Sequence, residues 1–217
     1  MISKFKRIEE LFYEIDENLT DKVNVYIIGG AALLFEGLKP ATKDIDLILK
    51  DKDEFNFFNK SLVTINFKEE NPSGIYKKME LNKIMVRDDY RIDAFLKKVC
   101  KKFALSNDMI KRSNEILNLK NISVNKCSNE DIFLFKSMTE RPGDLEDCIE
   151  LIKKGLDWDE IKDEMINQIK TNGEDVWITW IGERLDELIE KGLTIPIMKD
   201  IDKMRNDYFN KIEKSIK

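Results

Sequence analysis

The feature that most restricts the fold of this chain is a short apolar run that ends in two adjacent glycines. Residues Val23–Ile28 are mostly apolar and β-branched, which predicts a buried strand. Gly29 and Gly30 follow, and Ala31–Phe35 continues without a helix breaker, so we expect a helix to begin directly after the glycines. A strand that passes through two glycines into a helix presents backbone N–H groups at a positive helix terminus. This arrangement favours binding of an anion such as a phosphate.

The second feature is a pair of acidic residues that alternates with aliphatic residues. Residues 44–49 read Asp-Ile-Asp-Leu-Ile-Leu, which predicts a strand with Asp44 and Asp46 on the same side. Two neighbouring carboxylates repel each other unless a cation lies between them, and hard oxygen ligands suit magnesium. Asp93 lies in a similar pattern within Tyr90–Leu96, and we expect a neighbouring strand to bring it beside the pair. Three such carboxylates can hold two metal ions at a phosphorus centre.

The composition limits the chemistry that remains. The 217 residues include no histidine and three cysteines without a Cys-x-x-Cys pair, which excludes His-based nucleophilic catalysis and argues against a disulfide framework. The net charge of -5 argues against non-specific nucleic-acid binding as the main role, although a local basic face is compatible with it. No apolar run approaches the roughly 18 residues of a membrane span. We therefore expect a cytoplasmic protein with no membrane partner.

The remaining patterns predict an α/β domain followed by a mostly helical one. In the first part, helices are expected over residues 3–18 and 52–60, and strands over 62–67, 75–81, 84–87 and 90–96. The next segment is mixed, with a helix near 106–113 and a strand at 122–125. Helical patterns then cover residues 129–139, 144–154, 158–170, 174–191 and 197–215. We place the domains at residues 1–100 and 101–217.

The order of these motifs resembles the signature of the DNA polymerase β-like nucleotidyltransferase superfamily. The segments Ile28–Ala32 and Gly37–Leu47 are similar to small prokaryotic nucleotidyltransferases, which include abortive-infection toxins of the AbiEii type. The resemblance implies an α+β fold, with a twisted mixed sheet flanked by helices and followed by a helical region. It also implies an enzyme that moves a nucleoside monophosphate from an NTP such as ATP to an acceptor hydroxyl and releases pyrophosphate. Asp44, Asp46 and Asp93 would ligate Mg²⁺ and perform the catalysis.

The resemblance also assigns nucleotide contacts near the first strand. Gly29 and Gly30 would cradle the triphosphate, with Thr42 and Lys43 as further contacts ahead of the acidic pair. Thr42 has the alternative role of supporting the turn, and Lys43 that of a solvated side chain. Relatives often have Ser in place of Gly30 and Arg near Lys39, so this chain lacks one hydroxyl and one guanidinium that would bind phosphate.

A second region of resemblance contributes Lys136 and Asp144. Lys136 would neutralise phosphate charge, and Asp144 would accompany it on a following helix. This chain departs from the pattern because Gly143 stands where a basic residue often precedes the first acid. Both residues also have structural alternatives. A lysine in an apolar helix often snorkels or pairs with an acid, and an acid that follows Pro142 complements the helix dipole.

Three further questions stay open at this point. A non-catalytic module of the same fold, such as a toxin–antitoxin component that binds a nucleotide or a cognate antitoxin, is the main alternative to an enzyme. A metal-dependent glycosyltransferase also uses Asp-x-Asp, but it does not predict the strand–Gly-Gly–helix element before it. The acceptor is open among tRNA or other RNA, a protein hydroxyl and a small molecule such as an aminoglycoside, with RNA favoured by analogy with the toxins.

Overall fold

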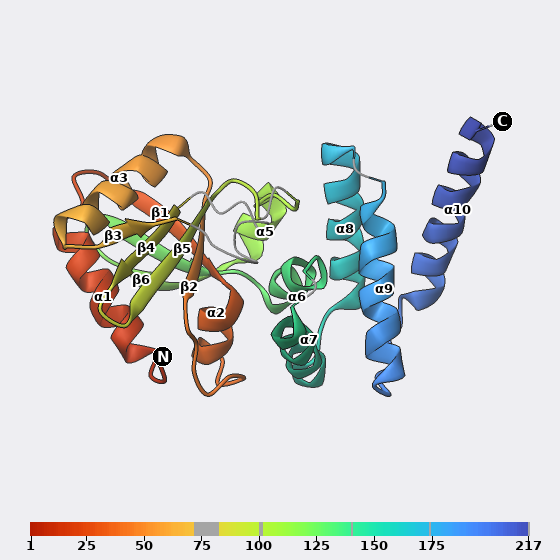
Figure 1. Ribbon diagram of the computed structural model, residues 1–217, viewed down its shortest axis with the longest axis horizontal. Coiled ribbons are helices and arrows are strands. Elements are labelled where there is room, and N and C mark those ends of the chain that lie inside the picture. The colour runs from red at the N-terminus through yellow and green to blue at the C-terminus, as the bar shows by residue number, and fades with distance from the viewer. Residues whose placement is uncertain (72–82, 100–101, 140, 174, 217) are drawn as a thin grey trace. The chain divides into compact units, whose positions relative to one another are not determined.

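The computed structural model describes residues 1–71, 83–99, 102–139, 141–173 and 175–216. The chain divides into two compact units, Met1–Ser128 and Asn129–Lys217. The first unit is built around a seven-stranded sheet with flanking helices, and the second consists of helices (Figure 1). This is the α+β architecture that the sequence predicts, with a mixed sheet and a helical C-terminal region.

The sheet of the first unit is mixed. Its strands are β1 (Val23–Ile28), β2 (Ile45–Leu49), β3 (Lys68–Glu70), β4 (Lys83–Arg87), β5 (Tyr90–Leu96), β6 (Asn114–Asn118) and β7 (Ile122–Lys126). They follow the order β3-β4-β5-β2-β1-β7-β6, in which β1 pairs with β7 and β2 with β5 in parallel, and the other neighbours are antiparallel. Every residue of the central strand β2 is buried, which explains why that strand is rich in aliphatic residues.

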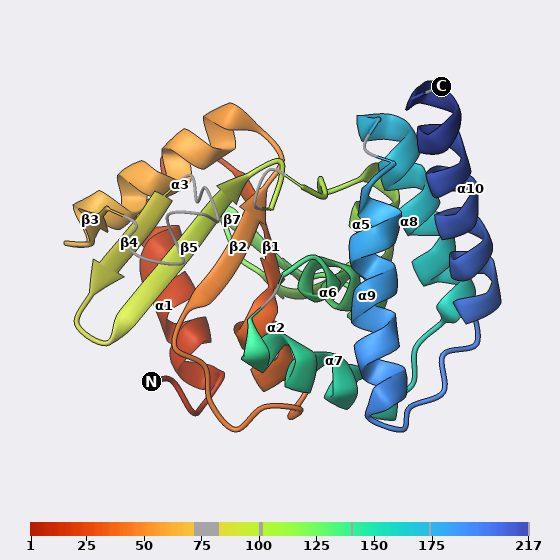
Figure 2. The same ribbon diagram turned by 45° about the vertical axis from the view of Figure 1, so that its right-hand side comes forward.

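Two helices cover one face of this sheet. The helices of the first unit are α1 (Lys6–Glu17), α2 (Gly29–Phe35), α3 (Lys52–Thr64) and α5 (Asn107–Arg112). Arg87 of β4 donates to Glu14 in α1 and to the carbonyl of Ile65 just after α3, so both helices lie against the same face (Figure 2). The opposite faces of β2 and β5 carry the acidic residues discussed below.

The structure differs from the sequence-based expectations in several places, and β3 is one of the strands that the sequence did not predict. The strand expected over residues 62–67 is wrong, because α3 continues to Thr64 and buries Phe55, Phe58 and Leu62 at helical spacing. The strand β6 was not predicted, because its polar sequence shows little alternation. The compact units divide after Ser128 rather than at residue 100, because β7 pairs with β1 inside the sheet. The strand expected over residues 75–81 lies outside the described residues.

The second unit has the helices that the sequence predicts, with bounds that differ by a few residues. They are α6 (Asn129–Ser137), α7 (Pro142–Lys154), α8 (Trp158–Asn172), α9 (Trp177–Glu190) and α10 (Met198–Ile216). Helix α6 packs against α7, α8 and α9 and is buried over most of its length, whereas α10 packs against α9 (Figure 2). Among the described residues, no helix is both long enough and apolar enough to cross a membrane.

Candidate active site

The two glycines after β1 allow side chains from the next loop and strand to approach the backbone closely. A Cβ atom at Gly29 would lie 2.1 Å from Oδ2 of Asp46, and the φ angle of Gly29 is +64°. A Cβ atom at Gly30 would lie 2.5 Å from Oγ1 of Thr42. Both separations are shorter than a normal Cβ contact, so a side chain at either glycine would force Asp46 or Thr42 to shift. The glycines therefore bring the start of α2 into contact with the acidic strand β2 and the loop before it.

Thr42 holds this loop in place. Its hydroxyl donates to the carbonyl of Asp44 at 2.9 Å, and its backbone exchanges two hydrogen bonds with Ile2, each 2.8 Å long. Thr42 is buried, whereas the neighbouring Lys43 is exposed. These contacts give Thr42 a structural role in positioning the residues that lead into β2. The predicted contacts of Thr42 and Lys43 with a nucleotide stay predictions.

Asp46 and Asp93 lie beside each other on neighbouring parallel strands. Asp46 in β2 pairs in register with Asp93 in β5, as the sequence predicted, and both side chains are buried, with 7% and 1% of their surface exposed. Residues paired in register point to the same face, and adjacent strands are about 4.8 Å apart. The strand begins at Ile45, so Asp44 lies just before β2, where it is half-buried. The fold thus concentrates negative charge on one face of β2 and β5.

This group of carboxylates suits a divalent cation in its chemistry and its backbone placement. Carboxylate oxygens are hard ligands of the kind that Mg²⁺ prefers, and two buried carboxylates in register need a positive charge nearby. The side chains, however, do not form a ready-made cluster: among the described residues, no three acidic or thiol side chains are grouped closely enough to hold a metal ion. Both oxygens of Asp93 accept hydrogen bonds from Arg91.

Two basic residues near this site received no role from the sequence. Arg91 forms an ion pair with Asp93. The sequence could have indicated this contact, because residues two apart in a strand lie on the same face. Cδ of Lys39 lies 3.9 Å from the position of a Cβ atom at Gly30, so the aliphatic part of this side chain passes next to the glycines. The sequence could indicate a basic residue in this loop, but only the fold shows that it reaches Gly30.

Lys136 and Asp144 lie in the helical unit, where they form part of a buried ion network. Nζ of Lys136 donates to Oδ1 of Asp144 at 3.0 Å and to Oδ2 of Asp147 at 2.6 Å. Arg141 also donates to both oxygens of Asp144, at 2.8 and 3.2 Å, and the Thr139 hydroxyl donates to the same carboxylate. The structure therefore brings Lys136 and Asp144 together with each other. Their predicted contact with a nucleotide stays a prediction.

The charges and hydrogen bonds within this network shift the pKa values of two of its members against the effect of burial. Burial opposes the ionisation of Asp144, but the charge of Lys136 and the hydrogen bonds from Arg141 outweigh it and lower the pKa to about 2. Burial likewise opposes protonation of Lys136, yet attraction to Asp144 and Asp147 raises its pKa above the usual value. Lys136 and Asp144 are therefore both ionised near neutral pH, and their attraction holds α6 and α7 together.

The chain matches one family model and is similar in fold to solved structures. Residues 3–179 match a family model described as "Nucleotidyltransferase of unknown function (DUF6036)". The fold is similar to the crystal structure of ANT(2")-Ia in complex with adenylyl-2"-tobramycin, with a TM-score of 0.50 and 11% identity over 77% of this chain and 98% of the other. It also matches a putative nucleotidyltransferase from Thermotoga maritima, with a TM-score of 0.42 and 12% identity over 61% and 83% of the two chains. No curated protein sequence matches.

Proposed function

Because the chain belongs to this nucleotidyltransferase family, we propose that it moves a nucleoside monophosphate from an NTP to an acceptor hydroxyl in a Mg²⁺-dependent reaction. The acceptor oxygen forms a bond to the α-phosphorus, the bond between the α-phosphorus and the bridging oxygen breaks, and pyrophosphate leaves with the bonding electrons. The observation that carries the proposal is the register between Asp46 and Asp93, with Gly29 in contact with Asp46. Similarity in fold to the ANT(2")-Ia structure is consistent with it.

Each residue of the site has a separate role in this proposal. Asp46 and Asp93 would hold the metal from neighbouring strands, and Asp44 would add a third carboxylate from the loop. The metal supplies positive charge that stabilises the attacking and leaving oxygens. Asp93 also accepts the proton of the attacking hydroxyl. Gly29 and Gly30 let the triphosphate approach the backbone at the end of β1.

The two compact units contribute differently to the proposed reaction. We assign the transfer chemistry to the unit that contains the sheet, because Asp44, Asp46 and Asp93 all belong to it. The helical unit contains none of these three carboxylates. The acceptor classes are RNA, as in the resemblance to abortive-infection toxins, a protein hydroxyl, and a small molecule. The last is included because ANT(2")-Ia was crystallised in complex with adenylyl-2"-tobramycin. The resemblance to toxins and a cognate antitoxin both stay predictions.

A labelling experiment tests this function directly. The protein is incubated with α-³²P-labelled NTPs and Mg²⁺ in the presence of total RNA, purified tRNA or tobramycin. We expect transfer of the label to one of these acceptors, and a loss of at least about 100-fold in Asp46→Asn, as is typical when an essential electrostatic contact is removed. Asp108→Asn is the matched control, because Asp108 is an exposed acid paired with Lys111 in α5. Equal transfer by Asp46→Asn and the unaltered protein would refute the assignment.

A further inference from the structure

Arg91 engages both oxygens of the most buried acid in the candidate site. Its Nε donates to Oδ1 of Asp93 at 2.7 Å, and its Nη2 donates to Oδ2 at 2.9 Å. Asp93 has 1% of its side-chain surface exposed, and Arg91 has 23%. Two parallel N–H···O bonds to a buried carboxylate form one of the stronger ion pairs in proteins. Any other cation that uses the same oxygens must therefore displace this guanidinium at least in part.

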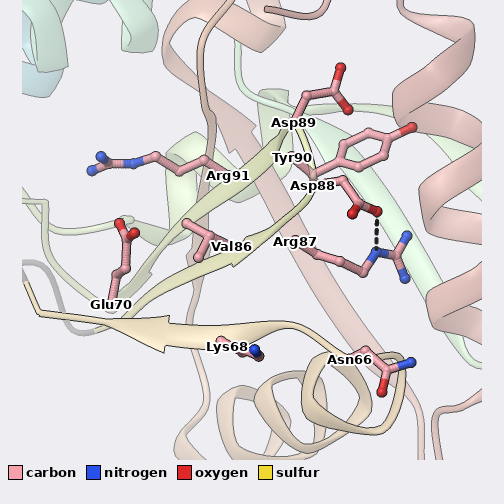
Figure 3. A pocket seen from close by; sticks show the side chains of 9 residues that line it. All are labelled: Asn66, Lys68, Glu70, Val86, Arg87, Asp88, Asp89, Tyr90 and Arg91. Carbon is pink, nitrogen blue, oxygen red and sulfur yellow. Dashed lines mark ion pairs between the residues drawn. The ribbon is translucent and has the colours of Figure 1, made fainter.

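The surroundings of Arg91 provide space for such a displacement. Val86 of β4 pairs in register with Arg91 on one side and with Lys68 of β3 on the other, so the three side chains lie in one row across the sheet. This row contributes to a hollow of about 700 Å³ at the β3–β5 edge of the sheet. Figure 3 shows Arg91 extending away from Arg87 along the opposite side of β5. Arg91 therefore lines an open space beside its ion pair with Asp93.

We propose that Arg91 competes with the divalent cation for Asp93, so that metal binding is coupled to release of the guanidinium into this hollow. The inference rests on the proposed function, because it takes Asp93 to be a metal ligand. Arg91 balances the charge of Asp93, and it repels a second cation from the same carboxylate. Arg91 is therefore a positioning residue that sets the metal affinity of the site.

The experiment measures Mn²⁺ binding to the full chain without nucleotide, by electron paramagnetic resonance of the free ion. Mn²⁺ is chosen because it prefers the same oxygen ligands as Mg²⁺. In Arg91→Gln, loss of the competing charge should lower the Kd for Mn²⁺ by about tenfold, which corresponds to roughly 1.4 kcal/mol. The melting temperature in the absence of metal should fall, because Asp93 loses its counter-charge. Added Mn²⁺ should recover more of that melting temperature in Arg91→Gln than in the unaltered protein.

Arg87→Gln is a matched control for this variant. Arg87 forms an equally bidentate pair with Glu14, both bonds being 2.7 Å long, but on the face covered by α1. Arg87→Gln should lower the melting temperature and leave the Kd for Mn²⁺ unchanged. If Arg91→Gln does not fold, Arg91→Lys retains the charge, loses the bidentate geometry and should lower the Kd by a smaller factor.

The possible outcomes separate this inference from the proposed function. Binding of Mn²⁺ that is lost in Asp93→Asn and tightened in Arg91→Gln supports both. Binding that is lost in Asp93→Asn but unchanged or weakened in Arg91→Gln overturns the inference and leaves the metal site intact. Absence of Mn²⁺ binding to the unaltered protein overturns the metal site and the inference together.

Discussion

Lys136 is the cation between two buried carboxylates in the helical unit, and its removal should be costly. The side chains of Lys136, Asp144 and Asp147 are each less than one tenth exposed. In Lys136→Met, the apolar chain fills a similar volume, but Asp144 and Asp147 keep their charges without the lysine. Breaking a buried ion pair in this way typically costs about 3–5 kcal/mol. Because Arg141 still pairs with Asp144, we expect the free energy of unfolding at pH 7 to fall by about 3 kcal/mol, near the lower limit of this range.

The pKa of Asp144, which Lys136, Arg141 and Thr139 all lower, adds a pH dependence to this prediction. Its pKa falls from 3.8 to about 2 in the folded protein, and a lowering of this size is worth about 2 kcal/mol of stability. Because the folded pKa is depressed, this contribution is complete above about pH 4 and is lost as the pH falls toward 2. The stability difference between the unaltered protein and Lys136→Met should therefore narrow over that pH range.

Tryptophan fluorescence offers a local assay for this prediction. All three tryptophans, Trp158, Trp177 and Trp180, lie in the helical unit, so urea denaturation followed by their emission reports on that unit. Lys153→Met in α7 is the control, because its pair with Glu150 is exposed and should contribute less than about 1 kcal/mol. Equal losses of stability in Lys136→Met and Lys153→Met would refute the reasoning. A loss of stability in Lys136→Met that is as large at pH 3 as at pH 7 would also refute it.

Three further predictions concern the glycines and a buried thiol. Gly29→Ala should abolish the proposed transfer activity, because the new Cβ atom would overlap Asp46 and the residue has a positive φ angle; full activity in the labelling assay would contradict this. Gly30→Ala should destabilise the protein by about 1–3 kcal/mol through overlap with Thr42, and adding Thr42→Ala should recover part of the loss in a urea double-mutant cycle. Burial raises the pKa of the Cys148 thiol to about 12, so iodoacetamide at pH 8 should modify Cys148 only as fast as the helical unit unfolds; rapid modification of the native protein would show that the thiol is accessible.

Local periodicity was sufficient to predict much of this fold. The apolar run Val23–Ile28 coincides with β1, and the helices of the second unit end near Gly155, Gly173 and Gly192, which all have positive φ angles. These features depend on residues close together in sequence. The expectation that Asp93 lies beside Asp46 was also confirmed, because the same alternation of acid and aliphatic residues occurs in both strands.

The features that sequence did not predict depend on contacts between distant segments. The apolar residues in 62–67 are compatible with either a helix or a strand. Packing of α3 against the sheet favours the helix, which continues to Thr64. The closeness of Gly30 to Thr42 depends on the path of the loop between them. Arg91 was visible next to Asp93, but spacing alone could not show that it holds both carboxylate oxygens.

The most direct test of the proposed site is calorimetric titration of each NTP into the purified protein, with and without Mg²⁺. The account predicts binding of at least one NTP that requires Mg²⁺ and disappears in the double variant Asp44→Asn, Asp46→Asn, with the urea midpoint confirming that the variant is folded. NTP binding that persists in the folded double variant, or no binding of any NTP to the unaltered protein, would contradict a metal-dependent nucleotidyltransferase site at β2 and β5.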